Sequence, residues 1–240
     1  RDVPNWRCYA NFTVVCSDTA TLAPEFWLPF EEGGECFGLA NLRLCQSHGR
    51  LADPPCEDTE LLGLNPCSEQ PLANRQICQL AEIMLPRIQS LAELLQAGRL
   101  LYRMCKHTLQ LQCFESTSQE VVQRKQHMGI SVTGYLSATD EQQSWLPHLY
   151  EDLRHYDEEY SEQLGSPPCQ KLTTVKPSGT LSSLCNPAMT HGWHPAHFHQ
   201  GIRRVRFSSS NPLVARCAAH GYPVEHAQRL DGSTDLSCSI

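Results

Sequence analysis

Apolar and polar residues follow two different spacings along the chain, one typical of helices and one typical of short buried strands. In residues 91–113 the apolar positions recur at helical spacing, which predicts an amphipathic helix. Residues 128–134 are small or β-branched and predict a short buried strand. Residues 142–164 predict an acidic, Tyr-rich helix with a break expected at Pro147, and Gly165 is placed to end it.

The same alternation continues towards the C-terminus. Residues 171–175 and 202–207 each predict a strand. Asn211 and Pro212 predict the beginning of a helix, and Gly221 predicts its end. Strands that alternate with helices indicate an α/β fold with a largely parallel sheet or barrel.

Composition narrows the class of protein. The 240 residues are 40% hydrophobic and 19% charged, as in an ordinary soluble protein. The net charge of −7 argues against nonspecific nucleic-acid binding, and no apolar run approaches the roughly 20 residues that span a bilayer. We therefore expect a cytoplasmic protein. The chain does not begin with Met and ends in an expected strand, so we expect residues 1–240 to be a fragment of one domain, with no second domain.

The 13 cysteines are irregularly spaced, odd in number and without a CxxC pair. A secreted disulfide framework is usually shorter and denser in cysteine. We therefore expect most of them to be small buried side chains in a reducing compartment.

The segment Asn65-Pro-Cys67-Ser-Glu69 carries an amide, a thiol and a carboxyl at alternate positions. In an extended segment these three side chains would face one pocket, where a carboxylate can move a proton beside a reacting sulfur. The alternative is a turn that begins at Asn-Pro and holds a buried cysteine. Cys78, considered alone, indicates a core cysteine at the beginning of a helix.

Residues 171–182 combine a predicted strand, a turn rich in Gly, Ser and Thr, and a helical start. Backbone N–H groups at such a helical start, with hydroxyl groups beside them, form an anion site. The spacing is not that of a Walker loop. The alternative is an ordinary capped turn.

Four histidines, at positions 191, 194, 197 and 199, are a competing feature. Imidazole is a common metal ligand, so a His/Cys-rich metal-binding module without catalysis is an alternative function. Pro195 stiffens this run and the spacing matches no standard zinc pattern, so we expect no metal site.

Two of these motifs, in this order, resemble those of ribonucleotide reductase large subunits. Residues 65–72 followed by Cys78 resemble the finger-loop signature, and residues 173–182 resemble the phosphate-loop signature. The chain is most similar to the monomeric, adenosylcobalamin-dependent branch that reduces ribonucleoside triphosphates. The resemblance is clearest from about residue 30 onward. It implies part of a ten-stranded α/β barrel with a central finger loop.

The resemblance also implies a role for each residue of the finger loop. Cys67 would carry the thiyl radical that takes hydrogen from the ribose 3′ carbon. Glu69 would accept the 3′-hydroxyl proton, and Asn65 would bind the ribose hydroxyls. Cys78 would be one half of the dithiol that supplies two electrons. The other half would lie upstream of this chain.

For the phosphate loop, the resemblance implies that Ser178, Gly179, Thr180 and Leu181 cradle the substrate phosphates. The implied cofactor is adenosylcobalamin and the implied electron donor is a thioredoxin-like protein. No nucleic-acid or membrane partner is expected. The Asn65–Glu69 motif is shared across the wider family. A reductase with another radical source, or one that acts on diphosphates, therefore stays an alternative.

Overall fold

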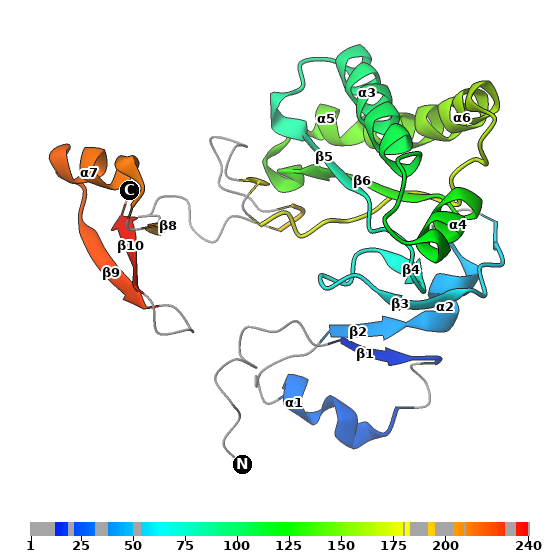
Figure 1. Ribbon diagram of the computed structural model, residues 1–240, viewed down its shortest axis with the longest axis horizontal. Helices are drawn as coiled ribbons and strands as arrows, with labels where there is room; N and C mark the ends of the chain where they lie inside the picture. Colours follow the sequence, from blue (N-terminus) through cyan, green and yellow to red (C-terminus); the bar gives the residue numbers. More distant parts are fainter. Residues whose placement is uncertain are drawn as a thin grey trace. The chain divides into compact units, whose positions relative to one another are not determined.

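The computed structural model describes residues 13–18, 22–31, 38–49, 54–179, 181–182, 192–194, 204–208, 210–228 and 234–239 (Figure 1). The chain forms two compact units, one of residues 11–197 and one of residues 1–10 and 198–240. Each unit is described by itself below. The single-domain interpretation stays a prediction.

A three-stranded parallel sheet forms the centre of the larger unit. Its strands β5 (Leu80–Met84), β6 (His127–Thr133) and β7 (Lys171–Thr173) lie in the order β5-β6-β7. Every residue of β6 is buried, as expected for the middle strand of a covered parallel sheet. The predicted α/β fold is confirmed, and so is the buried strand predicted at 128–134, which ends at Thr133. The strand predicted at 171–175 is confirmed for residues 171–173.

Two long helices cover one face of this sheet. They are α3 (Leu91–Leu109) and α6 (Leu146–Leu164), which lie side by side in Figure 1. Gly98 permits their close approach, because a Cβ there would lie 2.5 Å from Cδ1 of Leu149. The fully buried Leu94 and Leu153 belong to the core between the helices and the sheet. The helix predicted over residues 91–113 is confirmed and ends at Leu109.

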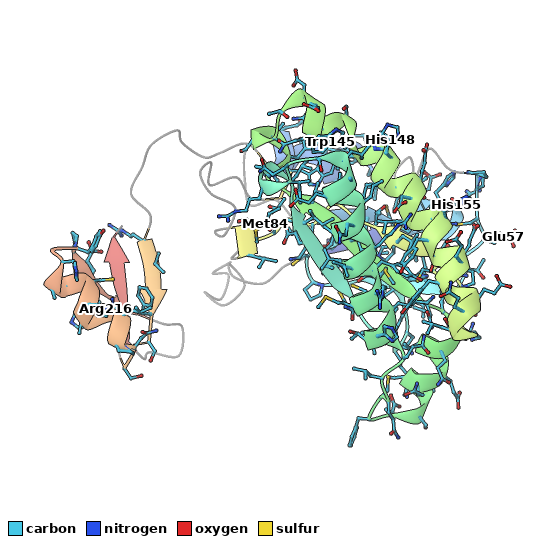
Figure 2. All side chains as sticks on the ribbon, turned by 90° about the horizontal axis from the view of Figure 1, so that it is seen from above. Glu57, Met84, Trp145, His148, His155 and Arg216 are labelled. Atoms are coloured by element: carbon cyan, nitrogen blue, oxygen red, sulfur yellow. The ribbon has the colours of Figure 1, made fainter. Side chains whose placement is uncertain are left out.

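The predicted break before Pro147 divides the acidic helical region into α5 (Asp140–Ser144) and α6. Pro147 lies in the first turn of α6, where a missing N–H has no cost. Trp145 and His148 mark the beginning of α6 in Figure 2, and His155 lies further along it. Gly165 ends α6 with φ 63°, the left-handed conformation predicted for it.

A buried polar network joins α3 to α6. The Tyr102 hydroxyl donates to Asp157 Oδ1 at 2.7 Å, and Lys106 Nζ lies 3.5 Å from the same oxygen. Lys106 also donates to the carbonyl oxygen of Pro167 at 2.7 Å. These contacts satisfy charges that would otherwise be costly to bury.

Shorter elements complete the larger unit. Strands β1 (Thr13–Cys16) and β2 (Gly38–Asn41) pair in parallel. Strands β3 (Leu61–Leu64) and β4 (Pro71–Ala73) form an antiparallel hairpin. The remaining elements are η3 (Pro24–Trp27), α1 (Leu28–Glu31), α2 (Leu42–Ser47), η4 (Leu85–Arg87), α4 (Ser116–Arg124) and η5 (Tyr135–Ser137).

The smaller unit contains an antiparallel sheet of β8 (Arg204–Phe207), β10 (Thr234–Ser239) and β9 (Val224–Gln228), in that order, and α7 (Pro212–Ala219). The Asn211 side chain caps α7 by accepting from the Leu213 N–H at 2.9 Å. The predicted helix is confirmed. The predicted strand is confirmed for residues 204–207, while 202 and 203 lie outside the described residues. The largely parallel sheet is confirmed only for β5–β7 and for the β1–β2 pair.

The cysteines differ from expectation in the described part of the chain. Nine are free thiols there, and only Cys105 and Cys169 of these nine are buried. The expectation that most are buried is therefore wrong for these nine. None of the described helices is long and apolar enough to cross a membrane.

Candidate active site

The Asn65–Glu69 motif lies in the turn that joins β3 to β4. The Asn65 N–H donates to the Gln70 carbonyl oxygen at 3.0 Å, and the Gln70 N–H donates to Asn65 Oδ1 at 3.0 Å. Ser68 has φ 64°, a left-handed conformation that reverses the chain. The expected extended segment is therefore wrong, because the Asn65 side chain closes a turn in its place.

Asn65 also brings Cys78 to this turn. Its side chain is buried, and its Nδ2 donates to Cys78 Sγ at 3.4 Å. Cys78 lies in the irregular segment before β5 and is exposed. The interpretation of Cys78 as a core cysteine at the beginning of a helix is therefore wrong.

The pKa of Cys78 depends on the groups that lie near its thiol. Partial burial raises the pKa of Cys78, and the hydrogen bond from Asn65 lowers that pKa in part. The nearby Glu69 carboxylate and the proximity of Cys67 raise it further. The turn thus brings the amide, the two thiols and the carboxyl into one cluster, although not by the alternation expected. The raised pKa keeps Cys78 a neutral thiol at pH 7, the form that holds a hydrogen atom to donate.

Glu69 has a carboxyl oxygen that lacks a protein partner. Its Oε2 is buried and accepts no hydrogen bond within the described part of the chain. A buried acceptor without a donor costs about 1–3 kcal/mol, which a bound hydroxyl group would offset. Cys67 is exposed at the same turn. The cluster therefore has a reachable thiol beside a carboxylate that can take a proton.

The phosphate-loop motif follows β7. Ser178 is buried with φ 53°, and its Oγ has no hydrogen-bond partner among the described residues. The Ser182 N–H donates to the Ser178 carbonyl oxygen at 3.3 Å, and Ser182 Oγ donates to the Gly179 carbonyl oxygen at 2.6 Å. These bonds form the tight turn and the 3-10 start over residues 181–182. Leu181 is exposed, and Thr180 lies outside the described residues.

Gly179 lies at an open position of this loop. A Cβ added there would meet no atom of the described residues within 4 Å. Among the described residues of the loop, the left-handed conformation belongs to Ser178. The open space beside Gly179 is compatible with close approach of an anion to the main chain.

A cavity of about 570 Å³ runs beside β7. Ser68, Glu69 and Gln70 line it from the hairpin turn, and Thr173 and Thr174 line it from the strand that leads into the phosphate loop. Asn65, Cys67, Cys78, Ser178, Gly179 and Leu181 are not among its lining residues. Gln70 and Thr174 were not predicted individually as site residues. The placement of Thr174, near the end of the strand predicted over residues 171–175 and just before the loop, was the one available signal.

Of the histidine run, the structure describes only His194, which is exposed. Positions 191, 197 and 199 lie outside the described residues. Within the described part of the chain, no three His, Cys, Asp or Glu side chains are placed to hold a metal ion.

Comparison with known proteins gives consistent results. The chain is 33% identical over 196 residues to the adenosylcobalamin-dependent ribonucleoside-triphosphate reductase of Euglena gracilis, and 31% identical over 222 residues to that of Lactobacillus helveticus. Each match covers 78% of this chain. A crystal structure of a B12-dependent (class II) ribonucleotide reductase matches 98% of the chain with a TM-score of 0.74 and 27% identity.

The chain is related to part of the B12-dependent ribonucleotide reductases. It spans 26% of the length of the Euglena relative, 29% of the Lactobacillus relative and 37% of the solved reductase chain. No protein-family model matches the chain. The resemblance drawn from the finger-loop and phosphate-loop motifs is confirmed, and the α/β fold agrees with that of the solved reductase.

Proposed function

We propose that this chain is the part of an adenosylcobalamin-dependent ribonucleoside-triphosphate reductase that carries the radical cysteine and the phosphate loop. The observation that carries the proposal is the hairpin turn at residues 65–70. Cys67, Cys78 and Glu69 lie near one another there, and one Glu69 carboxyl oxygen has no hydrogen-bond partner among the described residues. The relatives at about 30% identity are named for this reaction and this cofactor.

In this proposal Cys67, Glu69 and Cys78 each carry out a different part of the reaction. As a thiyl radical, Cys67 takes the hydrogen atom from the ribose 3′ carbon, and Glu69 accepts the proton of the 3′ hydroxyl. The 2′ hydroxyl then leaves as water with one proton from the dithiol that Cys78 forms with a second thiol. The other hydrogen of the dithiol goes to the 2′ carbon, and the two thiols give up two electrons and become a disulfide. Glu69 returns its proton to the 3′ oxygen. The hydrogen atom returns from Cys67 to the 3′ carbon, which leaves Cys67 ready for another radical cycle.

The exposed Cys67 is compatible with the cofactor named for the relatives. A radical generated outside the protein side chains has to reach the sulfur, and an exposed thiol at a turn allows that approach. When bound, adenosylcobalamin supplies the radical by homolysis of its cobalt–carbon bond. Asn65 fixes the turn beside Cys67 through its bonds to Gln70 and Cys78.

The phosphate loop indicates the class of substrate that the chain would bind. Two features suit phosphate oxygens: the Ser178 hydroxyl, which has no hydrogen-bond partner among the described residues, and the space that would lie beside a side chain at Gly179. A nucleoside triphosphate is the substrate, a thioredoxin-like protein reduces the disulfide, and the protein is cytoplasmic with no nucleic-acid partner. Roles for Thr180 and Leu181 belong to the same proposal.

The experiment uses the protein expressed from its complete gene. It is incubated with adenosylcobalamin, a dithiol and each ribonucleoside triphosphate or diphosphate, and deoxynucleotides are quantified. We expect triphosphates to be reduced only when the cofactor is present. Reduction of diphosphates alone, or reduction without adenosylcobalamin, would contradict the proposal. Stoichiometric zinc retained after dialysis, with no reduction, would favour a metal-binding module instead.

A further inference from the structure

A salt bridge joins the central sheet to the base of the phosphate loop. Lys176 Nζ lies 3.1 Å from Glu82 Oε2. The Glu82 side chain, on β5, is 0% exposed, whereas the Lys176 side chain is 21% exposed. Lys176 comes two residues before Ser178, the left-handed residue of the loop.

A second contact holds the same lysine through its main chain. The Lys176 N–H donates to Ser131 Oγ at 3.1 Å. Ser131 on β6 is the register partner of Glu82 on the neighbouring parallel strand. Side chains at paired positions of adjacent parallel strands point to the same face of the sheet. The ammonium group and the backbone of Lys176 are therefore fixed on one face, by two adjacent strands.

The stability of the fold alone does not explain why Glu82 and Lys176 form this ion pair. Glu82 Oε1 is buried and has no hydrogen-bond partner among the described residues. A buried carboxylate with one oxygen unsatisfied costs several kcal/mol in desolvation, and a single ion pair repays this only in part. Well-packed apolar residues would often be as stable. Fixing one arrangement of the chain is a better-attested use of such a pair.

We propose that Glu82 and Lys176 are positioning residues, which hold the loop so that Ser178 and Gly179 keep the turn geometry that binds the substrate phosphates. The proposal rests on the function proposed above. It extends that function to Glu82 and Lys176, two residues to which neither sequence motif assigned a role. Neither residue needs to touch the substrate, because the pair acts through the backbone that follows Lys176.

The test combines two measurements on the protein expressed from its complete gene. Hydrogen exchange reports the protection of the Lys176, Ser178 and Gly179 amides, and calorimetry reports affinity for a nucleoside triphosphate. In Glu82→Gln and in Lys176→Met we expect faster exchange at these amides and at least about tenfold weaker binding, equivalent to about 1.4 kcal/mol. The double variant should bind the nucleotide no more weakly than the single variant with the lower affinity, because both substitutions remove the same interaction.

Two further variants separate positioning from general loss of stability. Lys176→Arg keeps a cation for Glu82 and should retain both loop protection and most of the affinity. Lys106→Met breaks the buried pair with Asp157 between α3 and α6. It should lower the unfolding temperature without changing loop exchange or nucleotide affinity.

The outcomes distinguish the two proposals. Wild-type loop exchange and affinity in folded Glu82→Gln would overturn the positioning role while leaving the proposed function intact. If Lys106→Met weakens binding as much as Lys176→Met, the effect is general destabilisation, and the positioning role is again overturned. If the wild-type protein binds no triphosphate although Glu82→Gln still accelerates exchange, the proposed function fails and the pair is only a structural anchor.

Discussion

Thr174 donates a hydrogen bond from its Oγ1 to the carbonyl oxygen of Glu69 at 2.5 Å, and so joins the strand that leads to the phosphate loop to the hairpin turn that carries Cys67. Thr174 and Glu69 also line the same cavity. The two motifs are therefore connected directly, by a residue that belongs to the strand exit.

Replacing Thr174 with Val should loosen this connection. Valine keeps the shape but lacks the donor, so we expect a loss of about 1–3 kcal/mol in unfolding free energy. We also expect slower nucleotide reduction. Thr174→Ser keeps the hydroxyl and serves as the control. Denaturant unfolding and steady-state assays on both variants measure the two effects, and a Val variant as stable and active as the Ser variant would contradict the role given to this bond.

Local sequence patterns predicted the elements that local chemistry determines. The helix from Leu91 follows apolar spacing and a serine cap, since the Glu93 N–H donates to Ser90 Oγ at 3.2 Å. The end of α6 follows from Gly165, which adopts a left-handed conformation at little steric cost. Each of these features depends on neighbours within a few residues, so a single sequence contains the information.

The sequence suggested residues for the candidate site, whose roles stay predictions, but it did not predict the geometry of the finger-loop turn. The alternation of residues 65–69 suggested an extended segment, whereas the Asn65 side chain closes a turn with Gln70. The partners of Lys176 and Thr174 lie 94 and 105 residues away in sequence. Contacts over such separations leave no periodic signal, and only the folded chain shows them.

Cys67→Ser should abolish nucleotide reduction without unfolding the protein. An alcohol O–H bond is too strong to take part in a thiyl radical cycle. Because Cys67 is exposed, the substitution should change the unfolding free energy by no more than about 0.5 kcal/mol. Deoxynucleotide assays together with thermal unfolding test both statements. Measurable deoxynucleotide formed by the folded serine variant would remove Cys67 from its role.

Cys78→Ser should fail at a later step than Cys67→Ser. Hydrogen abstraction at Cys67 can still begin, but the two-electron reduction cannot finish, so we expect enzyme inactivation and release of base from the substrate. Asn65 can still donate to the new hydroxyl, which keeps the turn closed. Chromatography of the reaction mixture separates free base from deoxynucleotide. Normal multiple turnovers with a dithiol reductant would show that Cys78 has only a structural role.

Gly179→Val should weaken substrate binding at the phosphate loop while the protein stays folded. A Cβ at this position meets no atom of the described residues within 4 Å, so the branched side chain is expected to occupy the space offered to phosphate oxygens. Thr180→Ala should weaken substrate binding less. We expect a loss of about 1–3 kcal/mol in binding free energy, for one hydrogen bond to a charged group. Calorimetric nucleotide binding to both variants is the measurement. Unchanged affinity in Gly179→Val would mean that the loop is only a helix cap.

The last prediction concerns His127, a buried histidine at the beginning of β6. The pKa of His127 is lowered from 6.5 to about 4, mainly by burial. The nearby Lys171 and Lys125 contribute to this lowering, against hydrogen bonds with Gln170 and with the Pro71 backbone that raise the pKa. Nε2 lies 3.1 Å from Gln170 Oε1, which can only accept, so Nε2 carries the proton. The Asp58 carboxylate is 3.2 Å from Nε2, but Lys125 already pairs with that carboxylate.

The neutral ring gives the stability of the larger unit a definite pH dependence. Between pH 6.5 and about 4 the unfolded chain binds a proton at His127 that the folded chain does not, so this contribution is complete above pH 6.5 and is lost as the pH falls. A shift of this size corresponds to about 3 kcal/mol. His127→Gln keeps an N–H donor but does not titrate, so its unfolding free energy should fall less steeply over this window. Urea unfolding of both proteins at pH 4.5, 5.5 and 7 measures the slopes, and equal slopes would show that folding does not lower the pKa of His127.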